Sequence, residues 1–226
     1  MKKLFLGVGV NGEESRTILP LRGCDNDLEN WKNLLISSKY GFDVLATIPS
    51  NKVYKELVLE KFRELINQLN ESEGIGVFFF SGHGDDQLIG PGPNYNRIER
   101  VSCNNDYIPD YLFRIELQKF TNIESKLILI FDCCYSWDIT NSREEQRPEL
   151  LLAAGGRNQR AKEMNIGSNN FEGVFSHLAL KALDLPSSTN YERWIEETNK
   201  LIKAEGFTQQ SSIQGNSSIK LGSIFN

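Results

Sequence analysis

The sequence predicts an α/β protein whose central sheet is mostly parallel and is covered by helices on both faces. Three observations lead to this class. Short apolar runs are continuous rather than alternating, which is typical of strands buried on both faces. Gly, Asp, Ser or Asn residues flank these runs, and amphipathic stretches lie between them. Strands that alternate with helices favour right-handed crossovers and therefore parallel pairing.

Five apolar runs predict the strands in chain order: residues 4–10, 44–48, 75–80, 127–131 and 150–154. The first run follows two lysines and superficially resembles a secretion signal. It ends after seven residues at Asn11 without a small-residue cleavage site, which favours a buried first strand. No apolar run approaches the roughly 18–20 residues needed to cross a bilayer.

Five stretches between and after these runs predict helices: residues 26–37, 53–69, about 109–120, 173–183 and 190–205. In the second, apolar residues share one face at helical spacing, with lysines and glutamates opposite. Two segments, 85–102 and 135–149, are expected to be loops that directly follow strand ends. In open parallel sheets ligands bind beside such ends, so long loops there are more often functional than merely variable surface segments.

Composition narrows the classes of function. The 226 residues suit one domain, and the 39% apolar and 24% charged residues are near globular averages. The formal net charge of −5 disfavours nucleic acid and anionic membranes as partners. Four cysteines, two of them adjacent, do not form a disulfide framework, which indicates a reducing compartment and a cytoplasmic location.

Two residues with catalytic chemistry follow neighbouring candidate strands. His83 comes directly after one buried run, between Gly82 and Gly84, and Cys134 comes directly after another. If those strands pair, their backbones lie only about 4.8 Å apart, and the two side chains can meet. Taken alone, a histidine is more often structural and a cysteine more often a small core residue. Their matching positions favour a catalytic pair, whereas His177 lies within a predicted helix and is interpreted as a helix residue.

Three blocks of the sequence resemble those of metacaspases and bacterial caspase-like peptidases, the C14 cysteine peptidases. They are LRGCDND at 21–27, FFSGHG at 79–84 and FDCCYS at 131–136, with weaker similarity at 153–163 and 173–176. The resemblance implies one caspase-like domain over residues 1–226 without a prodomain. It also implies a three-layer sandwich and peptidase activity.

The resemblance assigns roles to particular residues. His83 and Cys134 match the catalytic dyad, and Cys133 would point into the core. Asp27 and Asp132, with Ser81 nearby, match the pocket that selects Arg or Lys before the scissile bond.

Chemistry supports an acidic pocket independently. Two close carboxylates repel, and a basic side chain relieves both through charge-assisted bonds. The alternative for Asp27 is a first-turn residue favoured by the helix dipole. True caspases prefer Asp and carry an Arg directly after the nucleophile, where this chain has Tyr135.

The sequence thus predicts a cysteine endopeptidase that cleaves after Arg or Lys. Backbone N–H groups of Gly84 and Cys134 would stabilise the oxyanion. Arg143 and Arg147, in the loop after the nucleophile, are candidate self-cleavage sites. The alternatives are a caspase-fold peptidase of other specificity and an inactive caspase-like scaffold that binds partners.

No cofactor is expected to be required. Calcium is an option through loop aspartates whose spacing departs from the family pattern: Asp85, Asp86, Asp106, Asp110 and Asp138. For zinc, the histidines and cysteines show no metal-ligand spacing. The expected partners are a protein or peptide substrate and, by family analogy, an activating or recruiting protein.

Overall fold

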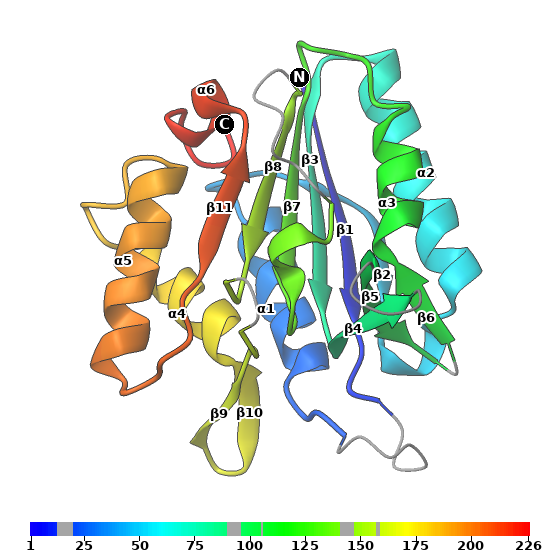
Figure 1. Cartoon of the computed structure of the whole chain (residues 1–226). Helices are drawn as coiled ribbons and strands as arrows, with labels where there is room; N and C mark the ends of the chain where they lie inside the picture. Colours follow the sequence, from blue (N-terminus) through cyan, green and yellow to red (C-terminus); the bar gives the residue numbers. More distant parts are fainter. Residues whose placement is uncertain (13–19, 90–95, 105, 141–146, 157–158) are drawn as a thin grey trace.

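A six-stranded sheet forms the centre of the structure (Figure 1), a computed structural model that describes residues 1–12, 20–89, 96–104, 106–140, 147–156 and 159–226. The strand order is β11-β8-β7-β3-β1-β2. The bounds are β1 Lys2–Gly9, β2 Asp43–Ile48, β3 Gly74–Ser81, β7 Lys126–Asp132, β8 Glu149–Ala153 and β11 Ser212–Gly215. All neighbours pair in parallel except β11, which runs antiparallel to β8 at one edge. The predicted class, a mostly parallel sheet, is confirmed.

Helices cover both faces of this sheet (Figure 1). On one face lie α2 (Lys55–Glu71) and α3 (Asp110–Leu117). On the other lie α1 (Cys24–Ile36), α4 (Val174–Ala182) and α5 (Tyr191–Ala204). The remaining helices of the described residues are short: η1 Ser50–Lys52, η3 Ser136–Asp138 and α6 Ser217–Lys220.

Strand β3 shows why the predicted apolar runs are continuous. Phe78 and Phe80 pack into the core under α2 and α3, whereas Val77 and Phe79 pack into the core under α1, α4 and α5. Side chains alternate between the faces of a strand, so a strand between two helical layers must be apolar at every position.

The segment 85–102, expected to be a loop, is mostly strand, and that expectation was wrong. A three-stranded antiparallel sheet comprises β4 (Gly84–Ile89), β5 (Asn96–Cys103) and β6 (Asp106–Pro109). Ion pairs join its strands, with Arg97 on Asp86 at 3.1 Å and Arg100 on Asp85 at 2.8 Å. Charged residues on both strands mask the apolar alternation from which a strand is recognised.

The carboxyl ends of β3 and β7 are level with one another. Ser81 pairs with Asp132 across the two strands. The same end of the sheet carries the small β4-β5-β6 sheet and a hairpin of β9 (Glu163–Gly167) and β10 (Asn170–Gly173) (Figure 1). Both flank the ends of the two strands from which His83 and Cys134 emerge.

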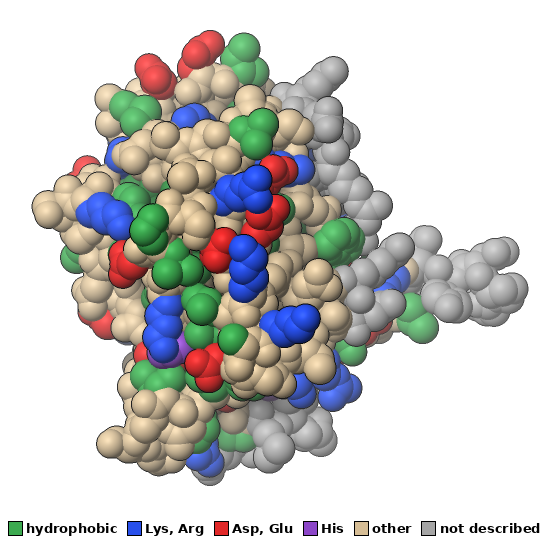
Figure 2. Space-filling model, turned by 90° about the vertical axis from the view of Figure 1, so that its left-hand side faces the viewer, with side chains coloured by type: hydrophobic (Ala, Val, Ile, Leu, Met, Phe, Trp, Pro, Cys, Tyr) green, Lys and Arg blue, Asp and Glu red, His purple; other side chains and the backbone are tan. Residues whose placement is uncertain are grey.

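The outer surface carries charges of both signs. Figure 2 shows Lys and Arg side chains interspersed with Asp and Glu on the face that includes α5. Ion pairs on that helix join Arg193 to Glu196 and Lys200 to Glu197, each at 2.7 Å. Within the described ranges, no helix is both long and apolar enough to cross a membrane.

Candidate active site

His83 and Cys134 line one cavity of about 380 Å³ at the carboxyl end of the sheet. Each lies two residues beyond the Ser81–Asp132 pair that ends the neighbouring strands β3 and β7. Gly82 donates its N–H to the carbonyl of Asp132 at 3.2 Å, which extends the contact between the two strand ends past the sheet. The register therefore brings these two predicted residues to the same cavity.

The Cys134 thiol is partly buried and points at a backbone carbonyl. Its Sγ lies 3.8 Å from the carbonyl oxygen of Ala161, a weak hydrogen bond. Burial raises the pKa of the Cys134 thiol, and the positive charges of Arg160 and Lys162 oppose that rise. The resting thiol is therefore neutral near pH 7 and needs a base to become a nucleophile.

Backbone geometry around Cys134 is tightly constrained. A β-carbon on Gly84 would lie 2.0 Å from the carbonyl oxygen of Cys134, so only glycine fits there. Tyr135 adopts the left-handed conformation, with φ of 55°, and donates its N–H to the carbonyl of Gln159 at 3.2 Å. A left-handed tyrosine directly after the thiol fixes the turn that presents Cys134 to the cavity.

Two buried carboxylates form the floor of the same cavity. Asp27, 1% exposed, accepts a hydrogen bond from the Ser81 hydroxyl at 2.8 Å and from the Gly173 N–H at 2.9 Å. Asp132, 4% exposed, accepts from the Ser176 N–H at 2.9 Å. All three predicted pocket residues, Asp27, Asp132 and Ser81, line the cavity. The floor is therefore polar, acidic and held in place by hydrogen bonds.

Burial disfavours the ionised forms of both carboxylates. Burial raises the pKa of Asp132 to about 6, and hydrogen bonds from Ser176 oppose the rise. Burial raises the pKa of Asp27 well above its usual value, and the charge of Asp132 adds to that increase. A cation placed between them would favour both ionised forms at once.

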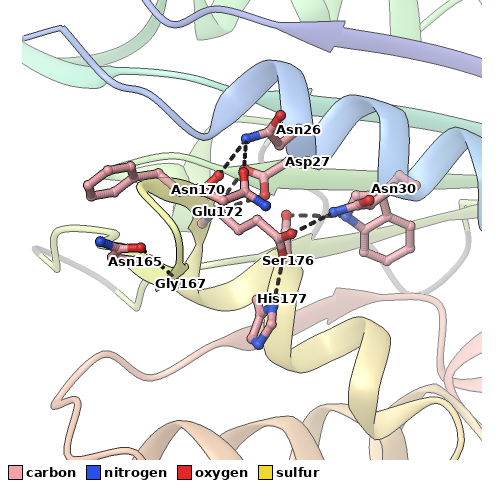
Figure 3. Close-up of polar contacts among 12 residues, drawn as sticks. Asn26, Asp27, Asn30, Asn165, Gly167, Asn170, Glu172, Ser176 and His177 are labelled. Carbon is pink, nitrogen blue, oxygen red and sulfur yellow. Dashed lines mark hydrogen bonds and ion pairs between the residues drawn. The ribbon is translucent and has the colours of Figure 1, made fainter.

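The β9-β10 hairpin, which closes one side of the cavity, is attached to α1 by polar contacts (Figure 3). Asn26 donates to the Asn170 side chain and to the Phe171 carbonyl, both at 2.8 Å. Asn30 donates to Glu172 at 3.0 Å. On the other oxygen of Glu172, His177 forms a contact of 2.6 Å through Nδ1. His177 lies in α4, as predicted, and its role there is to hold the hairpin against the helices.

Several residues at the cavity were not assigned a role from the sequence. Glu163 adds a third carboxylate, whose Oε1 accepts from the N–H groups of Arg22 and Gly23. Arg160 and Lys162 line the mouth, and Cys24 is a buried thiol at the wall. These residues come from the segment before β9, from the first residue of β9 and from the start of α1, which only the folded chain brings together. The weak family similarity at 153–163 assigned no role to Arg160, Lys162 or Glu163.

The candidate calcium residues do not converge in the structure. Asp85 pairs with Arg100, Asp86 with Arg97, Asp106 with Lys55, and Asp110 with Arg114. The Asp138 side chain lies outside the described part. Across the described residues, no group of three or more acidic, histidine or cysteine side chains is arranged to hold a metal ion. These pairings do not fit a shared calcium site.

Of the two candidate self-cleavage sites, Arg143 lies outside the described residues. Arg147 is described, and its guanidinium lies 4.0 Å from the buried Glu149 at the start of β8. The next residue, Pro148, accepts a hydrogen bond from the Leu127 N–H at 2.9 Å. The bond after Arg147 is thus anchored beside β7.

Comparison with known proteins agrees with this description. The fold is similar to that in the crystal structure of protein GSU0716 from Geobacter sulfurreducens, with a TM-score of 0.78 over 100% of this chain and 99% of that one, at 16% sequence identity. That similarity concerns the fold alone. No curated protein matches the sequence.

The sequence itself identifies the family. Residues 2–142, more than half of the chain, match the metacaspase, peptidase C14 domain. The chain therefore belongs to the metacaspase peptidase C14 family of cysteine peptidases. The predicted family is confirmed.

Proposed function

We propose that this protein is a cysteine endopeptidase that cleaves after Arg or Lys, with Cys134 as nucleophile and His83 as its proton acceptor. One observation carries the proposal. The cavity lined by Cys134 and His83 has a floor of two buried carboxylates, Asp27 and Asp132. A thiol and an imidazole beside an acidic pocket suit hydrolysis next to a basic side chain.

In the proposed reaction, His83 accepts the thiol proton as Cys134 Sγ attacks the scissile carbonyl carbon. The carbonyl oxygen takes the negative charge, which N–H groups of Gly84 and Cys134 would stabilise; one such donor contributes roughly 3–4 kcal/mol in other proteases. The intermediate collapses, the C–N bond breaks, and His83 returns the proton to the leaving amine. Water then attacks the thioester, yielding the new carboxyl group and the free thiol.

The raised pKa values of Cys134 and Asp132 both support this assignment. A thiol that is neutral at rest gives His83 a proton to accept at the moment of attack. In the empty cavity the raised pKa values favour the protonated carboxyl groups. An Arg or Lys side chain bound there would favour their ionised forms through its positive charge. Ser81 orients Asp27 for that contact.

Reporter peptides that differ only in the residue before the scissile bond test the proposal. We expect wild type to cleave after Arg and Lys, and Cys134→Ala and His83→Ala to lose at least about 10³-fold in kcat/KM, as in other nucleophile–base enzymes. Cys103→Ala, a buried thiol away from the cavity, is the matched control.

Three other results would contradict the proposal in different ways. Cleavage after Asp would indicate a caspase-fold peptidase of other specificity. An inactive wild type that still binds the peptides would indicate a scaffold. Full activity of Cys134→Ala would show that Cys134 is not the nucleophile. Assays with a chelator and with added calcium test whether a metal is needed, and an added protein partner would be sought only if the isolated chain is inactive.

Self-processing in the loop after Cys134 is part of the proposal, and Arg143 is the favoured position. Pro148 follows Arg147, and its fixed ring and missing N–H hinder the hydrolysis of the bond between them. Intact-mass analysis of wild type, Arg143→Gln and Arg147→Gln tests this. Loss of cleavage in Arg143→Gln supports it, whereas one uncut chain in wild type contradicts it.

A further inference from the structure

The mouth of the cavity is basic, although its floor is acidic. Arg160 and Lys162 are exposed and line the acidic cavity together with Cys134. They also line a second, adjoining cavity of about 470 Å³, whose other lining residues are Gln159, Glu163, Gly206, Phe207, Thr208 and Gln209. The two cavities therefore meet at a pair of cationic side chains.

The backbone that carries this pair is fixed on three sides. Gln159 accepts a hydrogen bond from the Tyr135 N–H, and the Lys162 N–H donates to the Gln209 side chain at 2.9 Å. The Lys162 carbonyl accepts from the Val174 N–H at 2.8 Å. Because these contacts reach the nucleophile turn, α4 and the segment before β11, the two cations hold a defined position relative to Cys134.

Neither cation is neutralised within the part of the chain that the structure describes. Arg160 hydrogen-bonds the Tyr135 side chain, and the Arg97 guanidinium lies over the same ring, 5.3 Å from its centroid. Among the described residues, no carboxylate forms an ion pair with Arg160 or Lys162. One oxygen of the nearby Glu163 accepts hydrogen bonds from the backbone N–H groups of Arg22 and Gly23. The mouth is therefore a cationic surface that can accept a carboxylate.

The position of the thiol decides which part of a substrate reaches this surface. Cys134 Sγ lies 3.8 Å from the carbonyl of Ala161, which is the residue between the two cations. A peptide whose carbonyl carbon meets Sγ and whose basic side chain enters the acidic floor must pass beside Ala161. Its neighbouring side chains then lie against Arg160 and Lys162, with the second cavity beyond them.

We infer that the substrate carries an acidic residue within two positions before the basic residue, and that Arg160 and Lys162 select it. This inference rests on the proposed function and adds a second specificity element of opposite charge. An acidic side chain there would form charge-assisted hydrogen bonds with one or both cations. Since the mouth is exposed, salt weakens the selection more than it weakens recognition by the buried floor.

Binding to an inactive protein tests the inference without catalysis. Cys134→Ala is titrated with fluorescent peptides that contain Arg before an uncleaved bond and either Asp or Asn at one of the two preceding positions. Fluorescence anisotropy gives each Kd. The Asp peptide is expected to bind about five- to tenfold more tightly than its Asn counterpart, with a smaller difference in high salt.

The double substitution Arg160→Gln and Lys162→Gln in the same Cys134→Ala background should abolish the difference and leave binding of the Asn peptide nearly intact. Lys181→Gln, an exposed cation on α4 that does not line either cavity, is the matched control and should keep the difference. Because the Cys134 thiol is absent from this background, an effect through its reactivity is excluded.

Different binding results would overturn the selection by Arg160 and Lys162 and the proposed function. Equal binding of the Asp and Asn peptides, or a difference that survives the double substitution, overturns the inference and leaves the proposed function standing. Failure of every Arg peptide to bind, with the proteins folded by circular dichroism, overturns both.

Discussion

A β-carbon on Gly173 would lie 2.2 Å from Oδ2 of Asp132. The same position would be 2.9 Å from Oδ2 of Asp27. Gly173 thus sits between the two carboxylates and donates its N–H to one of them. The absence of a side chain at Gly173 is what keeps both acids at the floor of one cavity.

Gly173→Ala should therefore displace the carboxylates of Asp27 and Asp132 without removing any side chain from the hydrophobic core. The added methyl group must push a carboxylate away, so we expect KM for Arg peptides to rise at least about tenfold, an effect of about 1.4 kcal/mol. Steady-state kinetics and a thermal melt check this. Gly222→Ala, where the nearest atom would be 3.2 Å away, is the control; equal kinetics for the two variants would contradict the role of Gly173.

Asp132→Asn should stabilise the fold while impairing cleavage after Arg and Lys. Burial raises the pKa of Asp132 to about 6, above the value of 3.8 for an exposed carboxyl. Between those pH values the folded state binds more protons than the unfolded state, so this group's contribution to the free energy of unfolding falls as pH rises. At pH 7.5 wild type carries the free-energy cost of ionising the buried Asp132, on the order of 3 kcal/mol, and the asparagine removes that cost.

Urea unfolding of both proteins at pH 4 and pH 7.5 measures this effect. The stabilising difference should be present at pH 7.5 and small at pH 4, where the native carboxyl is already neutral. Asp43→Asn, an exposed position on β2, is the control. A variant less stable than wild type at both pH values would contradict this expectation and show that the Asp132 carboxylate stabilises the fold.

Binding of a basic ligand should release protons near pH 6. An amidine in the cavity favours the ionised forms of Asp27 and Asp132, which lowers their pKa values from the raised values of the empty site. Calorimetric titration with benzamidine in two buffers of different ionisation enthalpy measures the protons released. The expected release is clear at pH 6, near the raised pKa of Asp132. The same heats in both buffers at pH 6 would contradict it.

Arg160→Gln should make the thiol less reactive at neutral pH. Burial raises the pKa of Cys134, and the Arg160 charge partly offsets that increase, so neutralising Arg160 raises the pKa further. The pH at which iodoacetamide alkylates Cys134 at half its maximal rate should move upward, as followed by peptide mass mapping. Lys181→Gln should leave the profile unchanged, and an unchanged profile in Arg160→Gln would show that its charge does not reach the thiol.

The central fold was predictable because its strands are buried on both faces. The predicted run 75–80 lies within β3, and 127–131 lies within β7. The half-exposed strands were not predictable in the same way, since residues such as Arg97 and Asp86 point at each other across β4 and β5. The exposed β9-β10 hairpin likewise lacks an apolar run.

The candidate site was only partly predictable for a similar reason. His83 and Cys134 could be found because each follows a recognisable strand, and the pairing of β3 with β7 brings them to one cavity. Asp27 comes from a helix, and its proximity to Asp132 was expected only from the family resemblance. Glu163 and Arg160 depend on tertiary contacts, such as the hydrogen bond between Tyr135 and Gln159, that no local pattern encodes.

Covalent labelling tests the central claim most directly. A peptide chloromethyl ketone ending in Arg should alkylate one cysteine, Cys134, and an otherwise identical reagent ending in Asp should react far more slowly. Mass mapping of the labelled peptide identifies the site, and His83→Ala should suppress the labelling. Modification of Cys24, Cys103 or Cys133 instead, or equal rates for the two reagents, would contradict a basic-specific peptidase built on Cys134.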